Sequence, residues 1–287
     1  MNKIVCYSHI GKRTNHEDNF FINGLYLTPN LKKQISNNHY CFVSNSAISS
    51  KILLFAISDG MGGHNGGDVA SKICVEKLSL AYKELQQYSS LKQIVSYLQV
   101  VIGEINNTVC ELSHEQYELK GMGATLILFV VYEGECAILN IGDSRAYYFK
   151  QNKLFQITKD HTEGQRMLDL GILTRKELFD FSARKNLNRY IGYSQNGYVL
   201  QADEYYPNIE NGILILCSDG ISDFVSDTRI ANILRSEKNL EIAGSQLINE
   251  AVRSYNSDNA TVILISLRRW FNGTNKFDWQ EHSRIYC

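Results

Sequence analysis

Apolar runs of strand length alternate along this chain with longer stretches of helical periodicity. Residues 67–85 and 90–117 repeat apolar side chains at helical spacing, which predicts two long helices packed as an antiparallel pair. Shorter runs, rich in β-branched and aromatic residues and bounded by turn residues, predict strands on both sides of this pair. Before the helices, the expected strands are residues 4–10, 19–27, 40–43 and 52–57.

After the helical pair the chain returns to strands and then adds two further helices. Residues 124–132 and 135–149 are β-rich runs that meet at Gly134, and with a third run over 153–158 they predict an antiparallel meander. The remaining expected elements are strands near 198–206, 212–218 and 260–267, and helices over 227–234 and 240–255 with caps at Ser226 and Asn239.

Strands interspersed with helical pairs predict an α+β fold in which two antiparallel sheets are flanked by helices. With 287 residues and 44% apolar content the chain can bury a full core, so we expect one domain over residues 1–267. The short, charged and helical pattern of residues 161–195 predicts a flap inserted over the active face. Residues 268–287 are rich in aromatic side chains, which predicts an extension that packs against the domain or docks a partner.

Composition narrows the compartment and the partners. Lys and Arg number 29 against 30 Asp and Glu, so no global field attracts nucleic acid or an anionic membrane. The seven cysteines are scattered without a Cys-x-x-Cys pair, which favours reduced thiols in the core. No apolar run reaches the roughly 18 residues that cross a bilayer, and the amino terminus lacks a signal region. We therefore expect a cytoplasmic protein, and we also expect a monomer.

Aspartates stand at the rims of several predicted strands. Asp59, Asp143 and Asp219 follow buried runs, and Asp258 precedes the last one. A single Asp-Gly after a strand is usually a turn residue. Carboxylates gathered at one edge of a sheet, however, raise one another's pKa unless a cation neutralises them. Because oxygen ligands favour Mg²⁺ or Mn²⁺ over zinc, the set predicts a divalent metal site.

A series of motifs surrounds these aspartates in a fixed order. They are Gly11-Lys12-Arg13-Thr14-Asn15-His16-Glu17-Asp18, the Asp59 loop through Ala70-Ser71, Gly121-Met122-Gly123-Ala124-Thr125, Gly142-Asp143-Ser144-Arg145-Ala146-Tyr147, Thr158-Lys159-Asp160-His161, Cys217-Ser218-Asp219-Gly220 and Asp258-Asn259-Ala260-Thr261. Together they resemble the metal-dependent protein phosphatases, the type 2C serine/threonine phosphatases, in their bacterial stand-alone branch. The resemblance spans roughly residues 3–267. It implies an αββα sandwich and a catalytic domain over residues 1–267.

The resemblance implies a metal-binding role for particular residues. Asp59 would bridge two Mn²⁺ or Mg²⁺ ions, and the carbonyl of Gly60 would bind one of them. Asp219 and Asp258 would complete the opposite side of the site.

Three other acidic residues match positions with less direct roles in the family. Glu17 and Asp18 match an acidic pair that touches the metals mainly through waters, the alternative being ordinary turn acids. Asp143 matches the aspartate that, with Asp219, holds a third metal in bacterial members. Its alternative role is to tie down a hairpin.

Groups that act on the phosphate are less completely matched. Arg13 matches the guanidinium that grips the substrate phosphate, and its planar fork suits bidentate contact. Animal relatives have a histidine directly after Asp-Gly, where this chain has Met61. His64 and His161 are therefore candidate catalytic residues that donate a proton or orient the site. Metal-bound water is the alternative proton donor.

The resemblance implies hydrolysis of phosphoserine and phosphothreonine on proteins by a metal-bridging water, without a phosphoenzyme, in opposition to a serine/threonine kinase. Cys217 lacks the Cys-x5-Arg loop of cysteine phosphatases, and neither a Gly-x-Ser-x-Gly elbow nor a nucleotide P-loop occurs. One alternative is a catalytically dead member that binds a kinase or regulatory partner. A narrower possibility is a developmental or stress-response phosphatase acting on a phosphorylated anti-anti-sigma-like protein.

Overall fold

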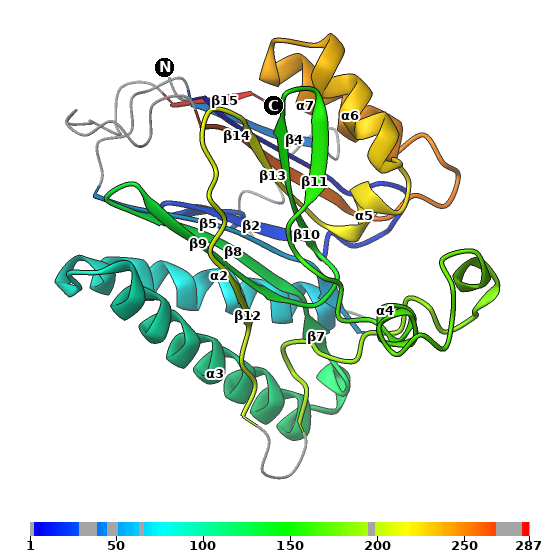
Figure 1. The fold of residues 1–287 in the computed structure, drawn as a ribbon. Helices are drawn as coiled ribbons and strands as arrows, with labels where there is room; N and C mark the ends of the chain where they lie inside the picture. The colour runs from blue at the N-terminus through cyan, green and yellow to red at the C-terminus, as the bar shows by residue number, and fades with distance from the viewer. Residues whose placement is uncertain are drawn as a thin grey trace.

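The protein is built in layers, helices on sheet on sheet on helices (Figure 1). The computed structural model describes residues 3–28, 39–44, 51–62, 66–194, 199–267 and 283–286. Helices α2 (Gly66–Glu84) and α3 (Leu91–Glu115) cover the outer face of one sheet, and α6 (Asp227–Ser236) and α7 (Leu240–Ala251) cover the outer face of the other. The predicted α+β sandwich of two antiparallel sheets is confirmed.

The larger sheet has seven strands, and its neighbours are all antiparallel. In chain order these are β1 (Ile4–His9), β4 (His39–Ser44), β10 (Arg145–Lys150), β11 (Lys153–Gln156), β13 (Ile213–Cys217), β14 (Ala260–Ser266) and β15 (Ser283–Tyr286). Their spatial order is β11-β10-β13-β14-β1-β4-β15, so the first and last segments of the catalytic region are neighbours in the middle of the sheet.

The smaller sheet has six strands and is also antiparallel. Its members are β2 (Asn19–Ile22), β3 (Leu25–Tyr26), β5 (Ile52–Ser58), β8 (Leu126–Tyr132), β9 (Glu135–Ile141) and β12 (Asp203–Tyr205). They lie in the order β12-β9-β8-β5-β2-β3. A separate short pair joins β6 (Gly60–Met61) to β7 (Gly123–Ala124).

Strand β5 shows why the central strands read as continuous apolar runs. Successive side chains of a strand point to opposite faces of its sheet. Ile52 and Leu54 accordingly join the core beneath α2 and α3, whereas Leu53 and Phe55 join the core between the two sheets. Because both faces are covered, every residue of the strand is buried and no polar alternation appears.

The predicted meander over residues 124–158 is wrong. Strands β8 and β9 form a hairpin in the smaller sheet, while β10 and β11 form a hairpin in the larger one. The chain crosses between the sheets at Gly142, whose φ of 102° is in the left-handed region. The composition is β-rich on both sides of this crossing, so the pattern of residues 135–149 gives no sign of the break.

Other expectations differ from the structure mainly at element ends. The run 19–27 is a tight hairpin with Asn23 at φ 48°, and the strand predicted near 198–206 is reduced to β12. The helix caps are confirmed, because the side chains of Ser226 and Asn239 each accept a backbone N–H of the first helical turn. The remaining short elements are η1 (Leu85–Gln87), η2 (Tyr117–Leu119), α4 (Glu163–Asp169), η3 (Glu177–Asp180) and α5 (Asp219–Ser222).

The carboxyl-terminal extension contributes one strand to the larger sheet. Strand β15 pairs antiparallel with β4 at the edge of that sheet. Residues 268–282 lie outside the described residues, and the domain boundary at residue 267 stays a prediction. In the described ranges no helix is both long and apolar enough to span a bilayer. The described cysteines are free thiols, as predicted, at Cys6, Cys41, Cys74, Cys110, Cys136 and Cys217.

Candidate active site

Strand pairing brings the predicted aspartates to one end of the sandwich. Asn19 pairs with Ser58 across β2 and β5, which places the preceding Asp18 beside the following Asp59. Cys217 pairs with Val262 across β13 and β14, so the end of one strand and the start of the other meet in the same way. We call the set formed by Asp18, Asp59, Asp143, Asp219 and Asp258 the acidic cluster.

Burial and mutual repulsion disfavour the ionised forms of this cluster. Burial raises the pKa of Asp18 to about 6, and nearby Asp258 adds to the effect. Burial, followed by Asp223, raises the pKa of Asp219 to about 7. The pKa of Asp59 is raised well above its ordinary value by burial, then by Asp18 and Asp219. These carboxylates are therefore close enough to interact strongly, and they lack a neutralising cation among the side chains that shift them.

Asp143 lies at the crossing between the sheets and belongs to the same electrostatic group. Its pKa is raised well above the ordinary value by burial, and then by the charges of Asp219, Asp160 and Asp223. The Asp160 carboxylate is itself paired with Arg145, whose Nη2 lies 2.6 Å from Oδ2. The structure therefore brings Asp143 to Asp219, as the family resemblance implies.

One carboxylate oxygen of the cluster is prepared for a cation. Asp18 is fully buried, and its Oδ2 accepts hydrogen bonds from Thr261 Oγ1 at 2.6 Å and Ser218 Oγ at 2.8 Å. Its Oδ1 is buried and has no hydrogen-bond partner in the described part of the chain. Because an unpaired buried carboxylate oxygen is costly, a divalent cation or its hydration water fits this position.

The carboxylates of the acidic cluster lie near one another, but they do not surround a single position as the ligands of a metal ion do. In the ranges that the structure describes, no three acidic, histidine or cysteine side chains surround a point as the ligands of a bound ion do. Asp258 is turned to an ion pair with Nη2 of Arg13. The carboxylates nevertheless lie close together, because after burial the charges of Asp18 and Asp219 raise the pKa of Asp59 and those of Asp258 and Asp18 raise the pKa of Asp219.

Asp59 is positioned by the strand end that follows the helical pair. Thr125 N–H donates to the carbonyl of Asp59 at 2.8 Å, and Asp59 N–H donates to Thr125 Oγ1 at 3.1 Å. Ser58 Oγ donates to the carbonyl of Thr125 at 2.8 Å. A further hydrogen bond of 2.8 Å joins the hydroxyls of Thr125 and Ser144. The loop after β5 is thereby tied to β8 and to the sheet crossing.

Gly60 and Glu17 are held against the start of α2. A Cβ on Gly60 would lie 1.9 Å from the carbonyl oxygen of Gly67, so only glycine permits this approach. Gly60 N–H donates to the carbonyl of Glu17 at 3.2 Å, and Glu17 N–H donates to Asn259 Oδ1 at 2.6 Å. Both predicted residues therefore lie beside the loops that carry Asp59 and Asp258.

Arg13 reaches the cluster from an exposed loop. Its guanidinium contacts Asp258, and its side chain is 54% exposed. The loop is fixed by Gly11, whose φ is 66° and whose added Cβ would lie 2.0 Å from the Asp258 carbonyl oxygen. Arg13 is thus both accessible to a ligand and adjacent to the acidic cluster.

His161 is buried and uses both ring nitrogens. Gly142 N–H donates to Nδ1 at 3.0 Å, so Nε2 carries the proton that bonds Asp203 Oδ2 at 3.1 Å. Burial, and then Arg189, lower the pKa of His161. This arrangement holds the turn before Asp143. His64 lies outside the described residues, and the roles of both histidines as proton donors stay predictions.

Several side chains around the cluster were not singled out from the sequence. Thr125, Ser218, Asn259 and Thr261 supply hydrogen bonds to the cluster or its loops. Each stands within a recognised motif, at or next to the end of a buried strand, and that position was the available signal. Asp223 lies one helical turn after Asp219, and its partner is Lys185 of the predicted flap.

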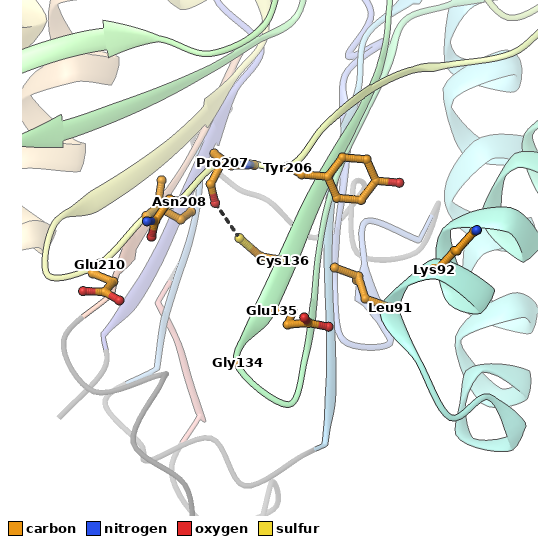
Figure 2. A pocket seen from close by; sticks show the side chains of 10 residues that line it. Leu91, Lys92, Gly134, Glu135, Cys136, Tyr206, Pro207, Asn208 and Glu210 are labelled. Carbon is orange, nitrogen blue, oxygen red and sulfur yellow. Dashed lines mark hydrogen bonds between the residues drawn. The ribbon is translucent and has the colours of Figure 1, made fainter.

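The cavity in Figure 2 is separate from the acidic cluster. It has a volume of about 530 Å³ and lies between the start of α3, the β8–β9 turn and the segment after β12. Cys136 Sγ donates to the Pro207 carbonyl across it at 3.5 Å, and burial raises the pKa of this thiol to about 12. The cavity therefore carries neither the cluster's carboxylates nor a reactive thiolate.

Fold, acidic end and motifs define a metal-dependent phosphatase domain, and the chain belongs to the protein phosphatase 2C family. The family model "Protein phosphatase 2C" matches residues 30–251. The chain is 32% identical over 210 residues to serine/threonine phosphatase stp of Listeria monocytogenes serotype 4b (strain F2365), covering 73% of this chain and 82% of that protein. It is 28% identical over 236 residues to protein phosphatase PhpP of Streptococcus pneumoniae serotype 2, covering 80% and 89% respectively.

Solved structures agree with the sequence relatives. Serine/threonine phosphatase Stp1 from Staphylococcus aureus matches with a TM-score of 0.76 and 28% identity, covering 93% of this chain and 96% of that one. The catalytic domain of serine threonine protein phosphatase PstP, in complex with two manganese ions, matches with a TM-score of 0.69 and 25% identity, covering 93% and 99%. The chain therefore shares the fold of a relative that contains two manganese ions.

Proposed function

We propose that this protein is a metal-dependent serine/threonine phosphatase that hydrolyses phosphoserine and phosphothreonine on proteins and opposes a serine/threonine kinase. One observation carries the proposal: carboxylates from both sheets meet at one end of the sandwich, where burial and repulsion raise their pKa values. Membership of the protein phosphatase 2C family supports the same activity.

The cluster has the donor set for two Mn²⁺ or Mg²⁺ ions. Asp59, the carbonyl of Gly60, Asp219 and Asp258 are the proposed ligands, and Asp18 offers Oδ1 to an ion or its water. When bound, such ions supply charge neutralisation for the phosphoryl group and activation of water at neutral pH. Asp143, with Asp219, is the proposed ligand pair for a third ion.

The chain's own residues supply substrate binding. Arg13 is exposed and has a planar fork of N–H donors, so we assign it to the phosphate of the substrate. Its pairing with Asp258, one of the proposed ligands, supports this assignment. Binding of the phosphate would then exchange one oxyanion partner for another.

A phosphocysteine intermediate has no support at this site. Cys217 is fully buried, and burial raises the pKa of its thiol to about 12. A thiolate is the nucleophilic form of cysteine. Because the pKa of this thiol is about 12, almost none of it is ionised near neutral pH. We therefore propose direct attack of water on phosphorus, and we propose that the protein acts as a monomer.

A metal-dependent assay on a phosphothreonine peptide tests this function. The metal-stripped protein should be inactive, regain turnover with added Mn²⁺ and lose it again with a chelator. Asp59→Asn should abolish both turnover and calorimetric Mn²⁺ uptake, because it removes the proposed bridging ligand. A protein that takes up no Mn²⁺ and shows no turnover would instead be the catalytically dead member. Full activity of Asp59→Asn would contradict the proposed site.

A further inference from the structure

A chain of hydroxyl groups runs from the half-buried His16 into the acidic cluster. His16 Nε2 lies 3.0 Å from Ser8 Oγ, and Ser8 Oγ lies 2.8 Å from Thr261 Oγ1. Thr261 Oγ1 lies 2.6 Å from Asp18 Oδ2. Ser8, Asp18 and Thr261 are all fully buried, so water does not compete for these contacts.

The direction of each hydrogen bond from His16 to Asp18 follows from the number of protons that each group can donate. An ionised carboxylate only accepts, so the single hydroxyl proton of Thr261 is donated to Asp18. Thr261 Oγ1 must then accept the proton of Ser8, and Ser8 Oγ must accept the Nε2–H of His16. No hydroxyl is left free to rotate its proton elsewhere.

Ser218 adds a second donor whose direction is equally determined. Its hydroxyl donates to Asp18 Oδ2 at 2.8 Å, while its oxygen accepts the backbone N–H of Thr261 at 3.0 Å. The backbone N–H of Ser218 also donates to the Thr261 carbonyl at 3.0 Å. The two donors of Asp18 are thus fixed relative to each other by strands β13 and β14.

All of this donation falls on one oxygen of the carboxylate. Oδ2 receives both hydroxyl protons, while Oδ1 is buried without a partner in the described residues. Rotating the Asp18 carboxylate would break two hydrogen bonds, so the side chain is locked with Oδ1 directed away from its donors. After burial, Asp18 is the strongest influence on the pKa of Asp59, which it raises.

We propose that His16, Ser8, Thr261 and Ser218 are positioning residues that lock the Asp18 carboxylate and so set the affinity of the acidic cluster for Mn²⁺. This inference rests on the proposed metal-dependent function. Partners that orient a metal ligand typically contribute about 10–100-fold to metal affinity. We call these four residues the positioning relay. The positioning relay orients the carboxylate and requires no change in the protonation of any of its members.

Calorimetric titration of the metal-stripped protein with Mn²⁺ tests the proposal. Thr261→Val keeps the shape of the side chain but removes the donor, and it should raise the Kd for Mn²⁺ by about 10–100-fold. Thr261→Ser keeps a hydroxyl and should restore a Kd near that of the unchanged protein. Ser8→Ala, which removes the donor to Thr261, should raise the Kd less than Thr261→Val.

A matched control separates positioning from loss of fold stability. Ile263→Val removes a methylene group from a fully buried side chain of the same strand, two residues further on, and should lower the melting temperature in chelator without changing the Kd. An unchanged Kd in Thr261→Val, or an equal change in Ile263→Val, would overturn the proposal. Should Thr261→Val fail to fold, Ser218→Ala with an unchanged Kd would overturn it.

The outcome is independent of turnover. If the variants show the expected order of Mn²⁺ affinities but the protein hydrolyses no phosphopeptide, the result supports the positioning relay and contradicts the proposed phosphatase function. If the protein hydrolyses phosphopeptides while Thr261→Val and Ser218→Ala bind Mn²⁺ normally, the result supports the phosphatase function and contradicts the positioning relay.

Discussion

Thr125 and Asp59 hold each other through reciprocal hydrogen bonds, one between backbone groups at 2.8 Å and one from the Asp59 backbone to the Thr125 hydroxyl at 3.1 Å. The position of the carboxylate proposed to bridge two ions therefore depends on Thr125, which is not among the proposed ligands. The loop that carries Asp59 is held where β5 ends beside the start of β8, so the motif that contains Thr125 serves to position Asp59.

Thr125→Val should lower kcat for a phosphothreonine peptide by about 10–100-fold, because it leaves the Asp59 N–H without its acceptor and frees the loop. Thr125→Ser retains the hydroxyl and should keep most of the activity. Steady-state kinetics at saturating Mn²⁺ measure both. Equal kcat values for Thr125→Val and the unchanged protein would contradict this role.

Arg13→Ala should lower kcat/KM for phosphopeptides by roughly 10–100-fold, because it removes the proposed contact with the phosphate. A hydrogen bond to a charged group contributes about 1.5–3 kcal/mol, which corresponds to a change of this size. Arg13→Lys should restore only part of the loss, because an ammonium group lacks the bidentate fork. Lys12→Ala removes the neighbouring exposed cation and is the matched control. An equal loss in Lys12→Ala would show a general charge effect instead.

The metal-free protein should become less stable as pH rises from about 4 to about 7. Asp18 and Asp219 have folded-state pKa values of about 6 and about 7, above those of an unfolded chain. The folded state therefore binds more protons in this window, and their stabilising effect is lost as pH passes the folded pKa values. Mn²⁺ bound at the proposed site would neutralise the same carboxylates.

Melting curves in chelator and in Mn²⁺ check this sign. The rise in melting temperature on adding Mn²⁺ should be larger at about pH 8 than at about pH 5.5, because protons compete for the ligands at the lower value. Comparing the two curves at each pH cancels groups far from the site. A larger gain at the lower pH would contradict the prediction.

His161→Asn should reduce activity without removing the basic limb of the pH–rate profile. Both ring nitrogens are engaged with Gly142 and Asp203, so we expect the side chain to hold a turn and not to deliver a proton. Loss of a buried hydrogen bond should destabilise the fold by about 1–3 kcal/mol. Disappearance of the basic limb would instead identify His161 as the proton donor.

The sequence was sufficient where a residue's neighbours along the chain determine its surroundings. The buried run of β5, the helical periodicity of α2 and α3, and the caps at Ser226 and Asn239 all follow from local pattern. Aspartates at strand rims indicated the acidic cluster, because antiparallel pairing brings strand ends together.

Features that depend on long-range geometry were not available from the pattern. The crossing at Gly142 looks locally like continued strand, so its change of sheet was missed. Thr261 reaches Asp18 across 243 positions, and Ser218 reaches it across 200. Nothing in the spacing of small hydroxyl residues distinguishes such contacts from ordinary buried side chains.

The division of the acidic cluster between the two sheets has a consequence for the sandwich as a whole. Asp18 and Asp59 flank strands of the smaller sheet, while Asp219 and Asp258 flank strands of the larger one. Ions shared among them would cross-link the layers at one end, whereas the core between the two sheets is apolar. Depletion of divalent ions should then loosen the molecule asymmetrically, with amide exchange accelerating first at that end of β5 and β14.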